Sequence, residues 1–106
     1  MSYQKRLLPS TSMLMALDAA ARAGSFTAAA KELNLTQGAI SRQVSALENQ
    51  LDVELFKRTG KTIRLSEAGK IYAREISAAL QAIRNASLNA MTNPLSGILN
   101  LAILPT

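Results

Sequence analysis

Apolar residues in the first half of the chain recur every three or four positions, and capping residues divide them into three short amphipathic segments. The first segment, residues 12–24, carries Leu14 and Leu17 on one stripe. It follows candidate N-cap residues at positions 10–12 and ends at Gly24, which accepts a positive φ. This pattern predicts a helix that turns one side to a core.

The second and third segments predict two helices separated by a tight turn. The second helix starts at Ser25 or Thr27 and ends at Asn34, a residue type that tolerates the left-handed conformation. The third helix is capped by Thr36, and its strong apolar stripe consists of Ile40, Val44, Leu47 and Leu51. Two helices joined in this way form a helix-turn-helix, here at about residues 25–44.

A β-hairpin is predicted after the third helix. Residues 54–58 and 62–65 both suit strands, and the turn between them contains Gly60, which is free to take a positive φ. The hairpin and its tip hold the densest positive cluster in the chain, formed by Lys57, Arg58, Lys61 and Arg64. A wing that contacts a polyanion and a merely solvated basic loop are both compatible with this cluster.

A long helix is predicted from the cap Ser66 to about residue 91, with Glu67 favourably placed in its first turn. Small and apolar residues recur along it at alternating spacings of four and three, which is typical of a dimerising seam. The seam consists of Tyr72, Ile76, Ala79, Ile83, Ala86 and Ala90. Three short helices cannot cover roughly 38 Å of helix, so we expect part of the seam to contact another chain.

The last residues have a different pattern. An apolar run at residues 97–105 suits a buried strand, but the chain offers no sheet for it to join. We therefore expect residues 92–106 to be a hinge and the first strand of a further domain, so that the sequence is the front piece of a longer protein. No run is long enough to span a bilayer, and no signal peptide follows Lys5 and Arg6, so we expect no membrane partner and a cytoplasmic location.

Composition narrows the classes of function. The 106 residues include neither His nor Cys, so the commonest general base, the commonest metal ligand and all disulfides are absent. The seven acidic residues are scattered along the chain, and we expect neither catalysis nor a cofactor. The net charge of +5 suits a polyanionic partner such as nucleic acid.

The polar face of the third helix suits the major groove of DNA. The small residues Gly38 and Ser41 permit close approach, and Gln37 and Gln43 can pair with an adenine edge. Arg42 can reach a guanine edge or a phosphate. The expected DNA contacts of this helix are Thr36, Gln37, Gly38, Ser41, Arg42, Gln43 and Ser45.

Phosphate contacts are expected on either side of that face. Ser25 and Thr27 lie at the start of the second helix, and Thr36 lies at the start of the third, where free N–H groups attract anions. On the wing, Arg58 and Lys61 suit phosphates or a narrow minor groove, where the negative potential is enhanced. Simple exposure to solvent is the alternative for each of these residues.

Taken together, the motifs resemble those of the LysR-type transcriptional regulators, from about Leu7 to Pro105. The residues that carry the resemblance are Ser25-Phe26, Ala29-Ala30, Leu33, Thr36-Gln37, Ser41-Arg42, Leu47-Glu48, Leu55-Phe56-Lys57-Arg58 and Leu65-Ser66-Glu67-Ala68-Gly69. The sequence departs from the family pattern at Gly38, where Pro is often found, at Asp52, where Gly is usual, and at Ser66, where Thr is common.

The resemblance implies a mainly α fold, in which a winged helix-turn-helix of three helices and a β-hairpin occupies residues 7–65. A linker helix at residues 66–91 would pair antiparallel with its twin. The implied protein is a ligand-responsive transcription regulator that binds promoter DNA as a dimer or tetramer, in the bacterial cytoplasm at the nucleoid. Its small-molecule effector would bind only a missing C-terminal domain, whose first strand the segment GILNLAI resembles.

Two other functions are compatible with parts of the pattern. A helical adaptor would use the seam to bind partner proteins, but it would not need four basic residues around one glycine turn. A helix lying on a membrane surface would need a deeper apolar face than a seam in which alanine is the commonest residue.

Overall fold

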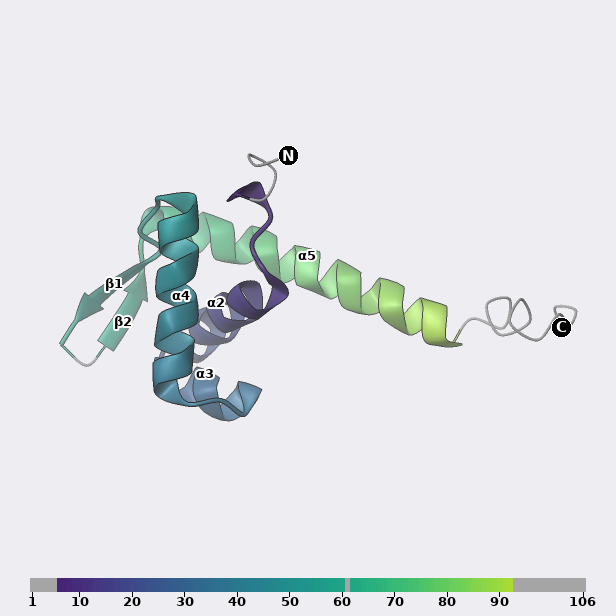
Figure 1. The fold of residues 1–106 in the computed structure, drawn as a ribbon, viewed down its shortest axis with the longest axis horizontal. Coiled ribbons are helices and arrows are strands. Elements are labelled where there is room, and N and C mark those ends of the chain that lie inside the picture. The colour runs from purple at the N-terminus through teal and green to yellow at the C-terminus, as the bar shows by residue number, and fades with distance from the viewer. Residues whose placement is uncertain (1–5, 61, 93–106) are drawn as a thin grey trace, which may run out of the picture. The chain divides into compact units, whose positions relative to one another are not determined.

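The computed structural model describes residues 6–60 and 62–92. In chain order its elements are α2 (Thr11–Ala23), α3 (Phe26–Leu33), α4 (Gln37–Leu51), β1 (Phe56–Thr59), β2 (Thr62–Leu65) and α5 (Glu67–Thr92), as Figure 1 shows. The predicted fold class, helices plus one hairpin and a long helix, is confirmed.

Contacts divide the chain into two compact units, Met1–Ile76 and Ser77–Thr106, whereas the sequence suggested a boundary at residue 65. The exact domain limits stay a prediction.

The three short helices begin and end at the capping residues that the sequence indicates. Each N-cap side chain accepts a hydrogen bond from the backbone amide three residues later, and each C-terminal residue has a positive φ. These residues are Ser10, Ser25 and Thr36 at the N-terminal ends, and Gly24, Asn34 and Asp52 at the C-terminal ends. The turn of the helix-turn-helix therefore depends on Asn34, whose φ is 61°.

The core of the first unit lies among α2, α3, α4 and the base of the hairpin. Its largest fully buried side chains are Leu17, Ile40, Val44, Leu47 and Leu55. The rings of Phe26 and Phe56 meet edge to face at 5.7 Å and join α3 to β1. The apolar stripes predicted for the three helices thus converge on one core.

The start of α5 is fixed to the residues that precede the hairpin. The Ser66 hydroxyl donates to the carbonyl of Glu54 at 2.6 Å and accepts from the Gly69 amide at 2.9 Å, which confirms Ser66 as the cap. A Cβ at Gly69 would lie 2.0 Å from the carbonyl oxygen of Leu55. Only glycine therefore lets α5 pass so close to this backbone.

The hairpin is antiparallel, and its register pairs Phe56 with Leu65 and Arg58 with Ile63. Gly60 has a φ of 61°, as the turn requires. The prediction that the first strand starts at residue 54 was wrong, since β1 begins at Phe56. The reason is local, because the backbone before β1 is already bonded to side chains of α4 and of the α5 cap.

The second unit is described as far as Thr92, where α5 ends. Its residues are largely exposed, and they include Ile83, Leu88 and Met91, which are 57%, 57% and 82% exposed. Within residues 6–60 and 62–92, no helix is both long and apolar enough to cross a membrane. The strand and hinge expected after residue 92 lie outside the described residues, as does Lys61.

Candidate nucleic-acid interface

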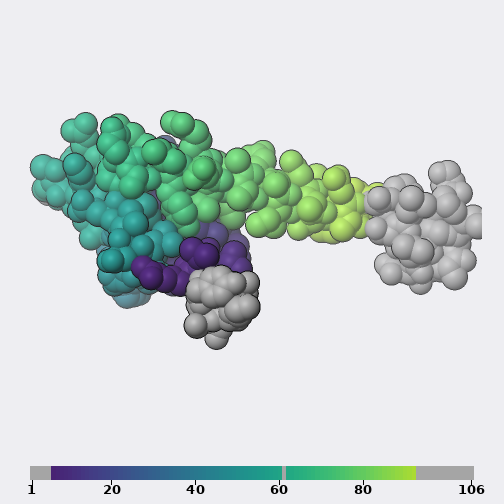
Figure 2. Space-filling view, turned by 90° about the horizontal axis from the view of Figure 1, so that it is seen from above, coloured from purple at the N-terminus to yellow at the C-terminus, as the bar shows by residue number. Residues whose placement is uncertain are grey.

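A cleft of about 450 Å³ lies between the start of α3, one side of α4 and the hairpin. Figure 2 shows the teal atoms of α4 and the hairpin next to each other at the surface of the first unit. The cleft is lined by Ser25, Phe26, Thr27, Gln37, Ser41, Arg58, Gly60, Thr62 and Ile63. The fold thus brings five of the predicted DNA-binding residues together, and they come from three separate segments: Ser25, Thr27, Gln37, Ser41 and Arg58.

One row of α4 faces the hairpin. Gln37, Ser41 and Ser45 are spaced four residues apart and therefore lie one above another on the helix. The Arg58 guanidinium approaches the Ser45 hydroxyl at 3.5 Å, which places Ser45 at the wing end of the row. All three side chains are uncharged, and those of Ser41 and Ser45 are short, so a ligand can come close to α4 there.

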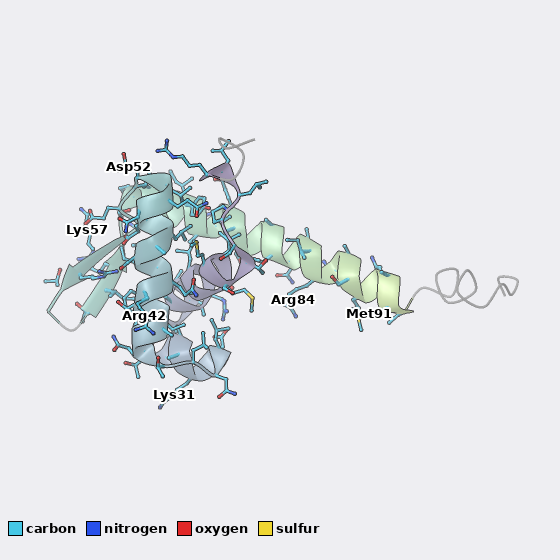
Figure 3. The ribbon with its side chains drawn as sticks, in the orientation of Figure 1. Lys31, Arg42, Asp52, Lys57, Arg84 and Met91 are labelled. Atoms are coloured by element: carbon cyan, nitrogen blue, oxygen red, sulfur yellow. The ribbon has the colours of Figure 1, made fainter. Side chains whose placement is uncertain are left out.

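Arg42 lies beside this row and is exposed, as Figure 3 shows. Its Nη1 atom lies 3.4 Å from the position that a Cβ would take at Gly38, so the side chain folds back along the first turn of α4. Thr36 uses its hydroxyl to cap Ala39 and leaves the helix start accessible. Gln43 is half-buried, and helical spacing places it on the opposite side of α4 from Ser41.

The hairpin separates the basic residues that the sequence groups together. Successive side chains of a strand point to opposite faces. Arg58 lines the cleft, whereas Lys57 and Arg64 are exposed and paired across the strands on the other face. Figure 3 shows Lys57 projecting from this hairpin. Only Arg58 of the described basic residues of the wing therefore faces α4.

Two residues with a direct influence on the cleft were missed by the sequence analysis. Phe26 belongs to the core and also lies under the Arg58 guanidinium, with 5.4 Å between its ring centroid and Cζ. Glu48 accepts hydrogen bonds from the amides of Leu55 and Phe56. Its spacing of seven residues from Ser41 was the available signal, because it places Glu48 on the hairpin side of α4.

A separate ion cluster joins α2 to α3. The Arg22 guanidinium donates to Asp18 at 3.1 Å and makes a two-pronged contact with Glu32, one branch of which is 3.0 Å long. The hydrogen bonds to Glu32 raise the pKa of Arg22, and the same contact lowers the pKa of Glu32. This cluster stabilises the angle between two helices and takes no part in the cleft.

The predicted seam of α5 divides into two parts. Tyr72 and Ile76 pack against the core of their own unit, and burial raises the pKa of Tyr72. The remaining positions are exposed in this single chain: Ala79, Ile83, Ala86 and Ala90. Ile83 also borders a hollow of about 370 Å³ together with Leu88 and Met91.

Residues 11–70 match the sequence model of a protein family, the bacterial regulatory helix-turn-helix proteins of the lysR family. The chain belongs to the LysR family. This LysR-family chain is 36% identical over 99 residues to the glycine cleavage system transcriptional activator of Escherichia coli K12, a match that covers 93% of the chain and 32% of that protein. It is 48% identical over 64 residues to the transcriptional regulator TrpI of Pseudomonas aeruginosa, which covers 60% of the chain and 22% of TrpI.

Solved structures of LysR-family proteins share the fold. The protein in the CbnR_DBD–DNA complex is 33% identical and superposes with a TM-score of 0.69, over 74% of this chain and 91% of that one. Vibrio fischeri DarR, solved in complex with DNA, is 27% identical with a TM-score of 0.67, over 88% of this chain and 29% of DarR. The chain spans about a third of the length of the Escherichia coli activator and carries the helix-turn-helix domain of a transcription regulator rather than of an enzyme.

Proposed function

We propose that the chain binds double-stranded promoter DNA in a sequence-specific manner, with α4 in the major groove and the hairpin against the adjacent backbone or minor groove. The observation that carries this proposal is the cleft, in which residues of α3, α4 and the hairpin meet around short polar side chains. The net charge of +5 supplies long-range attraction to a polyanion. The similar CbnR domain is known in complex with DNA.

Different residues have different roles in this proposal. Gln37, Ser41 and Arg42 contact base edges, with Gly38 allowing close approach, and Ser45 contacts the groove nearer the wing.

Ser25, Thr27 and Thr36 bind phosphates at the helix starts. Gln43 is the weakest candidate because it is half-buried away from the cleft. The wing supplies Arg58 to the cleft, and its other basic residues, Lys57, Lys61 and Arg64, contact phosphates.

The proposal extends to the whole protein. Two copies of the chain pair through the exposed part of the α5 seam, Ala79 to Ala90, and so hold two half-sites of DNA. A further domain binds a small-molecule effector, and the full-length protein forms a dimer or tetramer in the bacterial cytoplasm, at the nucleoid. The relatives of the chain support this extension, since their lengths leave room for such a domain.

Fluorescence anisotropy tests the proposal. A labelled duplex is first obtained from a random library by repeated selection on the chain, and a shuffled duplex of the same composition is the control. We expect tighter binding to the selected duplex and a steep loss of affinity with salt for both duplexes, because bound counterions are released. Failure of the selection to enrich any sequence, or equal affinity for the two duplexes, would contradict sequence-specific binding.

A further inference from the structure

The carboxylate of Glu48 links the recognition helix α4 to the wing. Its Oε2 atom accepts hydrogen bonds from two consecutive backbone amides, those of Leu55 at 2.8 Å and Phe56 at 3.0 Å. These amides lie where the chain enters β1. The Glu48 side chain is only 16% exposed, so the contact is largely shielded from solvent. Together with the burial of Leu55 and Phe56 in the core, this carboxylate holds the start of the hairpin against α4.

The second oxygen of the same carboxylate faces Arg58. Glu48 Oε1 lies 3.7 Å from Arg58 Nη2, and that nitrogen also lies 3.5 Å from the Ser45 hydroxyl. The ring of Phe26 supports the guanidinium from below at 5.4 Å. Arg58 is thus held by three side chains from α3 and α4, while its own side chain remains 44% exposed and lines the cleft.

A carboxylate beside a DNA-binding cleft repels phosphates, so Glu48 does not increase general affinity for DNA. Its contacts instead restrict where the wing and the Arg58 guanidinium lie. A mobile arginine attracts any phosphate, whereas a fixed planar guanidinium responds to the shape and width of the groove before it. The geometry therefore favours a role for Glu48 in selectivity.

We propose that Glu48 is a positioning residue, which holds the wing on α4 and aims Arg58 into the cleft so that Arg58 discriminates between DNA sequences. This inference rests on the proposed DNA binding. Glu48 is acidic and was not among the predicted DNA contacts, yet in this proposal it controls which duplex the chain prefers.

The variant Glu48→Gln tests the inference, because its amide oxygen can still accept from the backbone while its charge is lost. Glu54→Gln is the matched control, since Glu54 is exposed, precedes the same strand and changes the net charge by the same amount. We expect Glu48→Gln to bind the shuffled duplex at least as tightly as the wild type and to lose about tenfold in preference for the selected duplex. Glu54→Gln should keep the wild-type preference.

A double-mutant cycle with Arg58→Ala shows whether Glu48 acts through Arg58. We expect Glu48→Gln to change the preference little once Arg58 is absent. An equal loss of preference in both backgrounds, or no loss from Glu48→Gln alone, would overturn the inference. Absence of any preference in the wild type would instead overturn the proposed function, and the inference with it.

A second variant tests the role of Arg58 without removing the hydrogen bonds that hold the hairpin. Arg58→Lys retains the positive charge but not the planar fork, and it leaves the bonds from Glu48 to the hairpin amides in place. We expect it to keep the affinity for the shuffled duplex and to lose preference as Glu48→Gln does. Circular dichroism confirms that each variant is folded at the temperature of the titration. A wild-type preference in Arg58→Lys would contradict the role of a positioned guanidinium.

Discussion

Single side chains at the cleft differ in how much freedom they have. Arg42 is exposed and lies along the first turn of α4, whereas Arg58 is held against α4 and Phe26. Both are arginines near the cleft, yet their surroundings suit them to different tasks. Arg42 can extend to reach a base edge, and Arg58 offers a guanidinium whose place is already set.

We predict that Arg42→Ala weakens binding to the selected duplex about tenfold and reduces the preference over the shuffled duplex, because a base contact is lost. The control is Arg74→Ala, because Arg74 is an exposed arginine of α5 that does not line the cleft. This variant should keep the preference. Anisotropy titrations at one salt concentration measure both. A uniform loss on both duplexes would show that Arg42 binds only phosphate.

The two helical glycines, Gly38 and Gly69, respond oppositely to the same substitution. We predict that Gly69→Ala destabilises the fold by about 3 kcal/mol, because the new Cβ meets the Leu55 carbonyl. Gly38→Ala should stabilise it by roughly 0.5–1 kcal/mol, since alanine favours the helix and only the flexible end of Arg42 is nearby. Urea unfolding measures both changes, and equal effects would contradict the close approach at Gly69.

At the scale of elements, the sequence was sufficient to predict where the helices lie, but not to predict which side chains join one element to another. Periodicity and capping residues located α2, α3 and α4, because both signals are local. The late start of β1 and the role of Glu48 depend on contacts between residues seven or more positions apart. Helical spacing places Glu48 on the hairpin side of α4, but it does not indicate which backbone amides the carboxylate binds. Strand alternation separates the neighbours Lys57 and Arg58 already in the sequence, but only the structure shows which of them lines the cleft.

The link between α2 and α3 gives a prediction about pH. Arg22 lowers the pKa of Glu32 below its ordinary value of 4.5 in the folded chain, so the unfolded chain binds the proton more readily. The contribution of Glu32 to stability is therefore present above about pH 4.5 and is lost as pH falls through the lower folded value. Glu32→Gln should be less stable than the wild type at pH 7, and the difference should shrink in acid.

Thermal unfolding of both proteins from pH 7 to pH 3 measures this difference. Glu54→Gln is a suitable control, because Glu54 is an exposed acid whose own side chain has no ion pair within residues 6–60 and 62–92. A difference between wild type and Glu32→Gln that stays constant with pH would contradict the proposed linkage.

At the scale of the whole molecule, α5 serves two purposes. Its first turns complete the core of the first unit through Ala73, Tyr72 and Ile76. The later turns expose Ile83, Leu88 and Met91, which is unusual for a helix that remains alone in water. The sequence predicted that only part of the seam contacts another chain, and the structure shows which part remains exposed, since Tyr72 and Ile76 pack on their own core. We propose that the exposed part pairs with a second copy.

We predict that Ile83→Asp converts the chain to monomers, because a charge would be buried between two helices. Ile76 is unsuitable for this test, since it packs against the core of its own unit and its substitution would also destabilise that core. Gln81→Asp adds the same charge to an exposed position off the seam and should keep the wild-type oligomer. Sedimentation equilibrium distinguishes the two, and an unchanged oligomer in Ile83→Asp would place the interface elsewhere.

The location of the DNA-binding face is tested most directly by NMR. The ¹⁵N-labelled chain is titrated with the selected duplex, and the change in each amide signal is mapped on the sequence. We predict that the largest changes occur at the cleft, at Thr27, Gln37, Ser41 and Arg58, with little change around the Arg22 cluster. Changes concentrated around Arg22 or along the exposed turns of α5, with the cleft unaffected, would contradict the account.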